Sequence, residues 1–390
     1  MAAKRYLMTG MTPNPGGVEA YIMNLVRHLD PEKVRFDYLV NFEEPIAYEE
    51  KLREMGSEII RLPGRRKHPL RHQIEYRRFF RNVNGRYDGI YCNLLSLANI
   101  DDLTYAKKNG IRRILAHSHN SDDSGWDIFG IRKYLHRSHQ KTIKRYTETL
   151  FACSELAGTY MFGKDANFEI VHNAIDPERF RFQPEKRRAI REEMKIPTGV
   201  PLYGTVGRME EQKNPLFIVE IFHELHKKDP DAGLIYVGDG SMRGEVEKKL
   251  REYGLWDHCM ITGRVSDPSM YYQAMDAFLL PSLYEGLPVA LIEAQAADLP
   301  CFLTDAISDE TKIIGENYHK LSLGQQPSVW AEAIAGVVTG VETGKKTETR
   351  GKGIGAVPSH SRRDVSDRIK DAGFDILRTA KKMEDYLYHG

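Results

Sequence analysis

The sequence predicts an α/β protein that contains two doubly wound parallel sheets. Three observations lead to this fold class: the length, the alternation of short apolar runs with amphipathic stretches, and a restart of that alternation midway. At 390 residues the chain exceeds the size over which one hydrophobic core keeps growing, so two domains are expected. Strands that alternate with helices form a parallel sheet with helices on both faces.

The first series of elements precedes residue 175. An apolar run at 6–10 predicts a strand, and a loop with Gly16 and Gly17 follows it. Apolar residues at helical spacing then predict a helix over 18–29. Further buried strands are predicted at residues 36–40, 89–92, 113–117 and 150–153.

The pattern restarts after a stretch near 174–200 that three prolines interrupt. A strand is predicted at 202–207 and an amphipathic helix at 215–227. The remaining strands of this second series are predicted at residues 233–237, 259–263 and 277–281. Residues 340–362 are polar and glycine-rich, which is typical of an exposed loop, and residues 364–388 are predicted to be helical again.

Composition and the N-terminus exclude several classes of protein. The four cysteines form no CxxC pair, so neither a disulfide framework nor a zinc site is expected, and a reducing compartment fits. The N-terminal residues lack the apolar segment of a signal peptide, and no apolar run approaches the ~20 residues of a membrane span. We therefore expect a cytoplasmic protein that is soluble or peripheral at the inner face of a membrane.

The most informative segment is 281–294, in which a strand, a loop and a helix follow one another. Proline suits a first helical turn, so we expect the helix to begin near Leu287 and Pro288. Its start would offer unpaired N–H groups and a positive dipole end, both suited to a diphosphate. Glu285 and Glu293 could then flank a nucleotide-sugar, although acidic side chains near a helix start are also ordinary helix stabilisers.

A second constellation brings Arg208 and Lys213 to one loop after the strand at 202–207. Two cations there could neutralise a departing diphosphate, which a divalent metal does in other enzymes. A solvated pair of loop charges is the alternative. The sequence has no HExxH motif, and no metal site is predicted.

Together these segments resemble the retaining GT-B glycosyltransferases of family 4, especially the capsular and exopolysaccharide branch. The resemblance extends over nearly the whole chain. Its motifs, in the order that the family has them, are PxPGGVE at 13–19, HSHN at 117–120, CSE at 153–155, VHNAID at 171–176, GxxGRxxxxK at 204–213, VGDG at 237–240 and Glu-x7-Glu at 285–293. Asp298 departs from the pattern, because it stands where the family commonly has glycine before Leu-Pro.

The resemblance implies two facing Rossmann-like domains with a central cleft. Residues 1–174 together with 364–390 would form the acceptor-side domain, because the last helix of the family often returns to it. Residues 175–363 would bind the donor. Ligands of such sheets bind beyond the carboxyl ends of the strands, where the strand order reverses.

The resemblance also implies residue roles on the donor side. Arg208 and Lys213 would bind the diphosphate, and Glu293 would bind the ribose hydroxyls. Glu285, with the backbone of Gly286, Leu287 and Pro288, would contact the donor sugar and phosphate. Val265, in the loop after 259–263, would contact the base.

Three further residues would act from the first domain. Gly16 and Gly17 match a loop whose backbone approaches the phosphate and the acceptor, which glycine permits because it has no Cβ. His117 matches a histidine beside the donor sugar at the reaction centre, and His119 is a weaker candidate. The alternative for His117 is a buried histidine with an internal hydrogen-bond partner.

The function implied is transfer of a hexose or N-acetylhexosamine from a nucleotide-diphosphate sugar, preferably a UDP-sugar, to a lipid-linked or glycan acceptor in polysaccharide biosynthesis. No cofactor and no metal are expected. The departing phosphate would take the acceptor proton, and the anomeric configuration would be retained. Two alternatives bind the same donor: a GT-B nucleotide-sugar epimerase, and a non-catalytic nucleotide-sugar-binding subunit of a partner transferase.

A basic segment suggests where the protein acts. Residues 61–86 contain nine lysines and arginines and one acidic residue, with Phe79 and Phe80 among them. At about 1 kcal/mol per basic residue near an anionic leaflet, several would give reversible membrane docking. A solvated helix face and a nucleic-acid patch are alternatives, and nucleic acid is disfavoured because no known binding module accompanies the charge.

Overall fold

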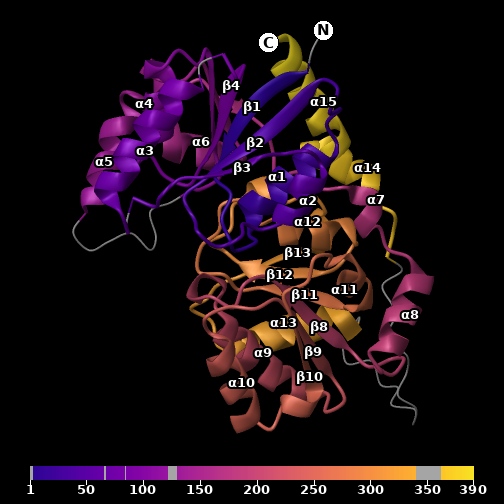
Figure 1. Ribbon diagram of the computed structural model, residues 1–390. Coiled ribbons are helices and arrows are strands. Elements are labelled where there is room, and N and C mark those ends of the chain that lie inside the picture. Colours follow the sequence, from indigo (N-terminus) through magenta and orange to yellow (C-terminus); the bar gives the residue numbers. More distant parts are fainter. Residues whose placement is uncertain (1–2, 66, 84, 122–129, 340–361) are drawn as a thin grey trace. The chain divides into compact units, whose positions relative to one another are not determined.

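The computed structural model describes residues 3–65, 67–83, 85–121, 130–339 and 362–390. The chain forms two compact units (Figure 1). Unit 1 comprises Met1–Ile175 and Gly373–Gly390, and unit 2 comprises Asp176–Ala372. Among the described residues, no helix is both long and apolar enough to cross a bilayer.

Unit 1 contains a seven-stranded parallel sheet in the order β3-β2-β1-β4-β5-β6-β7. Its strands are β1 (Lys4–Thr9), β2 (Val34–Val40), β3 (Ile59–Arg61), β4 (Gly89–Leu94), β5 (Arg113–Ser118), β6 (Thr149–Ala152) and β7 (Glu169–Ile170). The strand order reverses between β1 and β4. Ligands of doubly wound sheets bind at such a point.

Helices cover both faces of this sheet. They are α1 (Gly17–Arg27), α2 (Glu49–Glu54), α3 (Pro69–Asn82), α4 (Asp101–Lys108), α5 (Ile131–Gln140), η1 (Ile143–Arg145), α6 (Glu155–Phe162) and α15 (Ile376–His389). Side chains of β1 alternate between two cores: Tyr6 and Met8 pack with α1 and α15, whereas Leu7 packs with α3 and α4. The last helix, α15, yellow in Figure 1, lies against α1 and β2.

Unit 2 contains a six-stranded parallel sheet in the order β10-β9-β8-β11-β12-β13. Its strands are β8 (Leu202–Val206), β9 (Gly233–Val237), β10 (Cys259–Gly263), β11 (Ala277–Leu280), β12 (Cys301–Thr304) and β13 (Tyr318–Leu321). Here the order reverses between β8 and β11, which are the strands that precede the two predicted donor loops.

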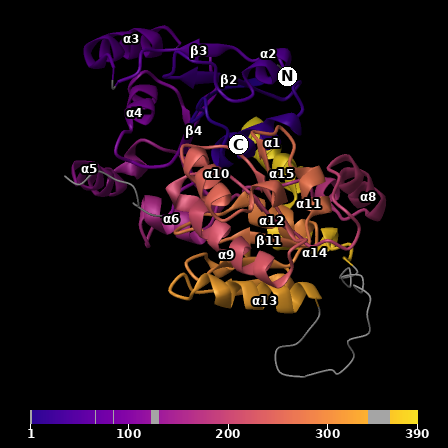
Figure 2. The same cartoon turned by 90° about the horizontal axis from the view of Figure 1, so that it is seen from below.

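The helices of unit 2 are α7 (Pro177–Phe180), α8 (Pro184–Glu193), η2 (Glu211–Lys213), α9 (Pro215–Lys228), α10 (Arg243–Glu252), η3 (Trp256–His258), α11 (Ser269–Ala274), α12 (Val289–Ala296), η4 (Asp309–Thr311), η5 (Gly315–Asn317), α13 (Pro327–Thr339) and α14 (Ser366–Ile369). Helices α9 and α13 lie side by side (Figure 2) and share a core with one face of the sheet. On the other face Tyr272 of α11 contacts Phe278 of β11.

The predicted strands agree with the structure to within two residues at either end, and those at 233–237 and 259–263 have the observed bounds. The stretch 364–388 is largely helical as predicted, but it is divided into α14 and α15. Gly373 adopts a φ of +88° inside a wide turn, Lys370–Phe374, which ends the first helical stretch. Asp375 then accepts a hydrogen bond from Leu377 N at 2.9 Å and begins α15 as its N-cap.

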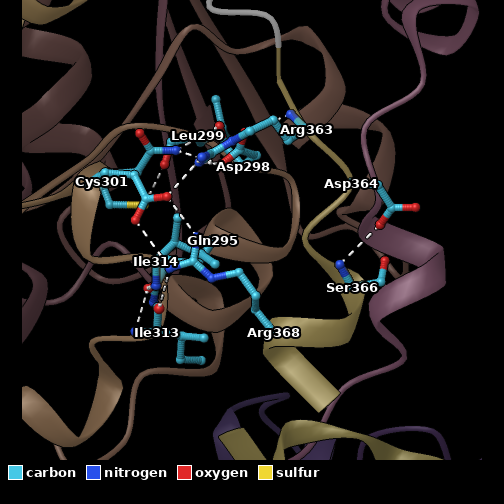
Figure 3. A network of polar contacts seen from close by, with 12 residues as sticks. Gln295, Asp298, Leu299, Cys301, Ile313, Ile314, Arg363, Asp364, Ser366 and Arg368 are labelled. Carbon is cyan, nitrogen blue, oxygen red and sulfur yellow. Dashed lines mark hydrogen bonds and ion pairs between the residues drawn. The ribbon is translucent and has the colours of Figure 1, made fainter. Parts of the chain in front are cut away.

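Residues 364–372 belong to unit 2, although the sequence analysis assigned them to the first domain. The reason is a polar network around Asp298 (Figure 3). The Asp298 carboxylate accepts hydrogen bonds from Arg363 N at 2.7 Å and from Asn317 Nδ2 at 2.7 Å. Arg368 of α14 pairs with Glu316 at 2.7 Å, so the segment after residue 361 is held on unit 2.

Candidate donor and acceptor sites

The carboxyl ends of β8 and β11 bring two predicted donor loops together in unit 2. Lys213, in η2 after β8, donates a hydrogen bond to Glu285, in the loop after β11. The loops are joined further by Leu283 N, which donates to Gln212 O at 2.8 Å. Both side chains of the Lys213–Glu285 pair are largely buried. Two residues predicted from separate motifs are therefore neighbours where the strand order reverses.

Arg208 extends into solvent from the first of these loops. The next acidic residue, Glu210, accepts hydrogen bonds from Ser241 N at 3.0 Å and Ser241 Oγ at 2.6 Å. Those hydrogen bonds, with a smaller effect of Arg208, lower the pKa of Glu210. Ser241 follows β9, so the loops after β8 and β9 are also connected.

Glycines allow these loops to pack closely. A Cβ on Gly238 would lie 1.9 Å from Gly207 O, and one on Gly240 would lie 2.4 Å from Met209 O. Gly204, the first glycine of the GxxGR motif, is required by packing as well, because its Cβ would lie 2.4 Å from Met275 Sδ. The VGDG and GxxGR motifs therefore fix the backbone that carries Arg208 and Lys213.

The helix after the second loop begins slightly later than predicted. Helix α12 starts at Val289, and Pro288 is its N-cap with extended backbone. Leu287 and Pro288 are buried, whereas Gly286 is partly exposed. The three residues thus form the turn before the helix, and the first free N–H groups of α12 belong to the residues that follow.

Glu293, the fifth residue of α12, is partly buried and hydrogen-bonded to Tyr272 of α11. Tyr272 Oη donates to Glu293 Oε2 at 2.7 Å. Burial raises the pKa of Glu293 to about 7, while Tyr272 and Arg179 act in the opposite direction. This carboxyl therefore titrates near neutral pH.

The loop after β10, which contains the predicted base contact Val265, is fixed by an ion pair. Arg179 of α7 contacts Asp267 Oδ1 at 2.7 Å, and Ser269 N donates to the same oxygen at 2.9 Å. Val265 itself is partly exposed. Tyr272, Arg179 and Asp267 belong to no motif, so the sequence alone does not identify them.

In unit 1, Gly16 and Gly17 begin α1. Gly16 is the N-cap, and a Cβ there would lie 3.1 Å from Glu19 Oε2. A Cβ on Gly17 would have no described atom within 4 Å. Glu19 is buried and accepts a hydrogen bond from Thr12 Oγ1 at 2.6 Å, which closes the loop of the PxPGGVE motif. Packing within unit 1 thus explains Gly16 better than Gly17.

His117 lies at the end of β5 with none of its surface exposed. Its Nδ1 is 2.9 Å from Tyr91 Oη, and Nε2 has no hydrogen-bond partner among the described residues. Burial, and to a lesser extent His119, hold the pKa of His117 well below its usual value. The ring is therefore neutral, and the predicted contact between His117 and the donor sugar stays a prediction.

His119 is 8% exposed and connects its own HSHN motif to the VHNAID motif and to Asn93 of β4. Its Nε2 is 2.9 Å from Asn93 Oδ1, and its Nδ1 is 3.2 Å from Asn173 Oδ1 of the VHNAID motif. Asn93 Nδ2 donates to Thr9 O at 2.9 Å, so its oxygen faces the ring and His119 carries a proton on Nε2. Asn93 is an isolated asparagine in a strand and belongs to no motif, so the sequence alone does not identify it.

The basic segment 61–86 is largely the helix α3. Phe80 is fully buried in the core and Phe79 is partly buried against it. The exposed apolar side chains are Leu70 and Ile74, at 80% and 67%. Several cations of the segment are paired internally: Arg61, Arg65, Lys67, Arg71 and Arg86.

Two further predictions concern the loop at 340–362 and the lack of a metal site. The predicted loop at 340–362 lies outside the described residues except for Arg362, which donates to Tyr272 O at 3.0 Å. In the described part of the chain, no group of three or more His, Cys, Asp or Glu residues could hold a metal ion.

Comparison with known families gives a match for each unit. Residues 186–353 match the family described as Glycosyl transferases group 1. Residues 15–179 match Glycosyltransferase Family 4. The two matches together span most of both units.

Individual relatives agree with these families. The chain is 32% identical over 346 residues to the putative glycosyltransferase EpsF of Bacillus subtilis (strain 168), covering 85% of this chain and 86% of that protein. Over 139 residues it is 29% identical to the Escherichia coli UDP-Gal:alpha-D-GlcNAc-diphosphoundecaprenol alpha-1,3-galactosyltransferase, covering 35% and 36% of the two chains.

Two solved structures share the fold over the whole chain. The Anabaena protein Alr3699/HepE, in complex with UDP and glucose, gives a TM-score of 0.73 at 15% identity, covering 99% of this chain and 100% of that one. WaaG, a glycosyltransferase involved in lipopolysaccharide biosynthesis, gives a TM-score of 0.70 at 15% identity, with coverage of 99% and 100%.

Proposed function

The chain belongs to the family 4 glycosyltransferases and has the GT-B fold, and from this premise we propose that it is a retaining, metal-independent hexosyltransferase. It transfers a hexose or N-acetylhexosamine from a UDP-sugar to a lipid-linked or glycan acceptor in capsular or exopolysaccharide biosynthesis. The predicted family and the two Rossmann-like domains are confirmed. The predicted cleft between the domains and the residue roles stay predictions.

The contact between Lys213 and Glu285 is the observation that best supports this donor site. A lysine ammonium has three N–H donors, so one can bond to Glu285 while the others bind phosphate oxygens. Arg208, on the same loop, adds a second positive charge. A diphosphate placed against both would be held where the strand order of unit 2 reverses.

In the proposed reaction, the bond between the anomeric carbon and the diphosphate oxygen breaks as the acceptor oxygen bonds to the same face of that carbon. The acceptor proton passes to the departing phosphate oxygen, so no side chain is needed as a base. Arg208 and Lys213 stabilise the negative charge that grows on the leaving group. Interactions of this kind accelerate a reaction because they strengthen in the transition state.

The relatives support parts of the donor and acceptor assignment. The Escherichia coli enzyme is named for a UDP-Gal donor and an alpha-D-GlcNAc-diphosphoundecaprenol acceptor, and HepE was solved with UDP and glucose. By analogy, the proposed substrates of this chain are a UDP-sugar donor and an acceptor sugar linked to a lipid diphosphate. An acceptor of that kind would require the enzyme to work at an anionic membrane surface, as a peripheral protein at its inner face.

A two-step assay tests the proposed function. Thermal shift against a panel of UDP-, GDP- and ADP-sugars identifies the donor by the increase in unfolding temperature that it causes. The stabilising sugar nucleotide is then incubated with the protein after EDTA treatment and without acceptor. Slow release of UDP and free sugar, with the sugar first formed in the donor's anomeric configuration, is the expected result.

Other outcomes identify the alternatives. Conversion of the donor to its epimer would support an epimerase, and binding without any turnover would support a nucleotide-sugar-binding subunit. Loss of hydrolysis after EDTA, restored by Mg²⁺, would contradict metal independence. Inversion of the released sugar at the anomeric carbon would contradict a retaining reaction.

A further inference from the structure

Glu293 is surrounded by groups that belong to no recognised motif. Tyr272 is fully buried on α11, and its hydroxyl lies 2.7 Å from Glu293 Oε2 and 3.2 Å from Ala290 O. The hydroxyl has a single proton, and a carboxylate is the stronger acceptor, so the proton lies toward Glu293. The other carboxylate oxygen, Oε1, accepts no hydrogen bond from the described residues.

The hydroxyl of Tyr272 is itself held firmly. Its ring packs on Phe180 of α7 and Phe278 of β11, at centroid distances of 5.8 and 5.9 Å. Arg362 donates to the backbone oxygen of Tyr272 at 3.0 Å. Both the ring and the backbone of Tyr272 are therefore fixed, and the orientation of Glu293 is fixed with them.

A second contact joins the same region to the loop after β10. Arg179 of α7 binds Asp267 at 2.7 Å, and α7 packs against both α11 and α12. The groups that act on the Glu293 carboxyl are Tyr272 from α11, Arg179 from α7 and Asp267 from the loop after β10. The other elements that pack on α12, which are α14, β11 and β12, contribute no described group that acts on it.

We propose that Tyr272 and Arg179 are positioning residues for the donor nucleotide. Tyr272 occupies Oε2 of Glu293 and leaves Oε1 for the ribose hydroxyls, while Arg179 orders the loop that contacts the base and favours the ionised carboxyl. This inference rests on the donor site of the proposed function. It adds a pH dependence: because burial raises the pKa of Glu293 to about 7, nucleotide binding strengthens as pH rises through that value.

Calorimetric titration of the full chain with UDP from about pH 6 to 9 tests the proposal. In Tyr272→Phe the dissociation constant at pH 7.5 should rise about tenfold, because a hydrogen bond to a charged group is lost. The pH at which binding strengthens should also move upward, since that hydrogen bond lowers the pKa of Glu293. Arg179→Ala should also move this pH upward. Arg179→Lys should move it less than Arg179→Ala does, because lysine keeps the positive charge.

Tyr271→Phe is the matched control, because Tyr271 lies beside Tyr272 in α11, whereas the hydrogen bond to Glu293 comes from Tyr272. It should bind UDP as the wild type does at every pH. Thermal unfolding without UDP reports whether each variant folds. Tyr272→Phe in a Glu293→Gln background should have no further effect on binding, since the carboxyl that it positions is absent.

The outcomes separate this inference from the donor site itself. If the wild type does not bind UDP, or Glu293→Gln leaves binding unchanged, the assigned donor site is wrong and the inference fails with it. If Glu293→Gln weakens binding but folded Tyr272→Phe matches Tyr271→Phe in affinity and pH profile, only the positioning role is overturned.

Discussion

Lys213 and Glu285 form an internal ion pair at the place where a diphosphate is expected. Each side chain is 17% exposed or less, so the pair is shielded from screening by solvent. A lysine paired with a carboxylate attracts an anion less strongly than an unpaired lysine does. Its remaining donors stay available, however, and Glu285 holds the ammonium in one position. The ion pair is therefore compatible with both a structural role and a catalytic one.

We expect Arg208→Ala and Lys213→Met each to lower the rate of donor hydrolysis by about 10²–10³, because each removes a charge that stabilises the leaving group. Steady-state kinetics with the stabilising UDP-sugar measures this effect. Lys227→Ala is the control, since Lys227 is an exposed cation of α9 paired with Glu224. Arg208→Ala that turns over at the wild-type rate would exclude Arg208 from the reaction.

Glu293 also predicts how stability varies with pH. Its pKa in the folded protein, about 7, exceeds the ordinary 4.5, so the folded state binds the proton more tightly. The contribution to stability is complete below the unfolded pKa and is lost as pH rises through about 7. Above that pH the partly buried carboxylate costs about 3 kcal/mol.

Glu293→Gln should therefore be more stable than the wild type at pH 8, with little difference at pH 5. Urea unfolding at the two pH values measures the change in unfolding free energy. Equal stability differences at both pH values would show that the carboxyl is not destabilised by burial. The same variant should bind UDP more weakly, so a gain in stability and a loss of binding are expected together.

At the scale of single elements, α3 is the part of the basic segment that could meet a membrane. Leu70, Ile74, Arg78 and Arg81 are exposed and share one side of the helix by their spacing. Apolar side chains flanked by cations favour binding at an anionic interface. We therefore propose that the docking surface is this side of α3 and not the whole segment 61–86.

Sedimentation with phosphatidylglycerol-rich vesicles at low salt tests this surface. The protein should sediment, and Leu70→Ser with Ile74→Ser should reduce the bound fraction several-fold, because each residue contributes about 1.5–3 kcal/mol when fully buried. Leu377→Ser is the control, since Leu377 is an exposed leucine of α15. Equal sedimentation of the control and the double variant would exclude α3, and no sedimentation of the wild type would exclude docking altogether.

The elements that the sequence predicted are those with a clear apolar pattern. Strands β9 and β10 are short apolar runs next to glycine, and they were located without error. The prediction missed β13, whose residues Tyr318–Leu321 include His319 and Lys320, because an edge strand buries too little to show a pattern. Strand β12 was missed because its four residues follow α12 closely and have no period of their own.

The site shows the same division. Residues in motifs, such as Lys213 and Glu285, could be predicted, whereas Tyr272 and Arg179 could not. Their roles depend on how α7 and α11 pack against α12. The sequence around Tyr272 has no pattern that predicts a contact with Glu293, which is 21 residues away. Supporting contacts of this kind arise only when the chain folds.

At the scale of the whole molecule, Asp298 holds residues 362–369 on unit 2 before the chain returns to unit 1. It adopts a φ of +49°, a left-handed conformation that favours glycine, in agreement with the glycine common at this position of the family. Asp298 adopts this strained backbone conformation without being glycine, and its carboxylate binds Arg363 and Asn317. The departure from the family pattern is thus an anchor for residues 362–369.

Arg363→Ala should lower the free energy of unfolding of unit 2 by about 1–3 kcal/mol, because it leaves the buried Asp298 carboxylate with fewer donors. Denaturant unfolding monitored by tryptophan fluorescence measures the loss. Lys248→Ala is the control, since Lys248 is an exposed residue with only a long contact to Glu252 at 3.8 Å. Equal stability of the two variants would show that the anchor adds nothing to unit 2.

The chain leaves unit 1 and returns to it at adjacent points. Ile175 N donates to Phe374 O at 3.0 Å, and Ile376 N donates to Ile175 O at 2.8 Å, so the departing and returning segments are paired within unit 1. Unit 2 is in this sense an insertion whose two ends begin side by side. Residues 176–372 could therefore be expressed separately. Alternatively, their two ends could be linked and new termini opened elsewhere to make a circular permutant. Either product would make the proposed nucleotide-binding unit small enough for isotope labelling and direct spectroscopic study of ligand exchange.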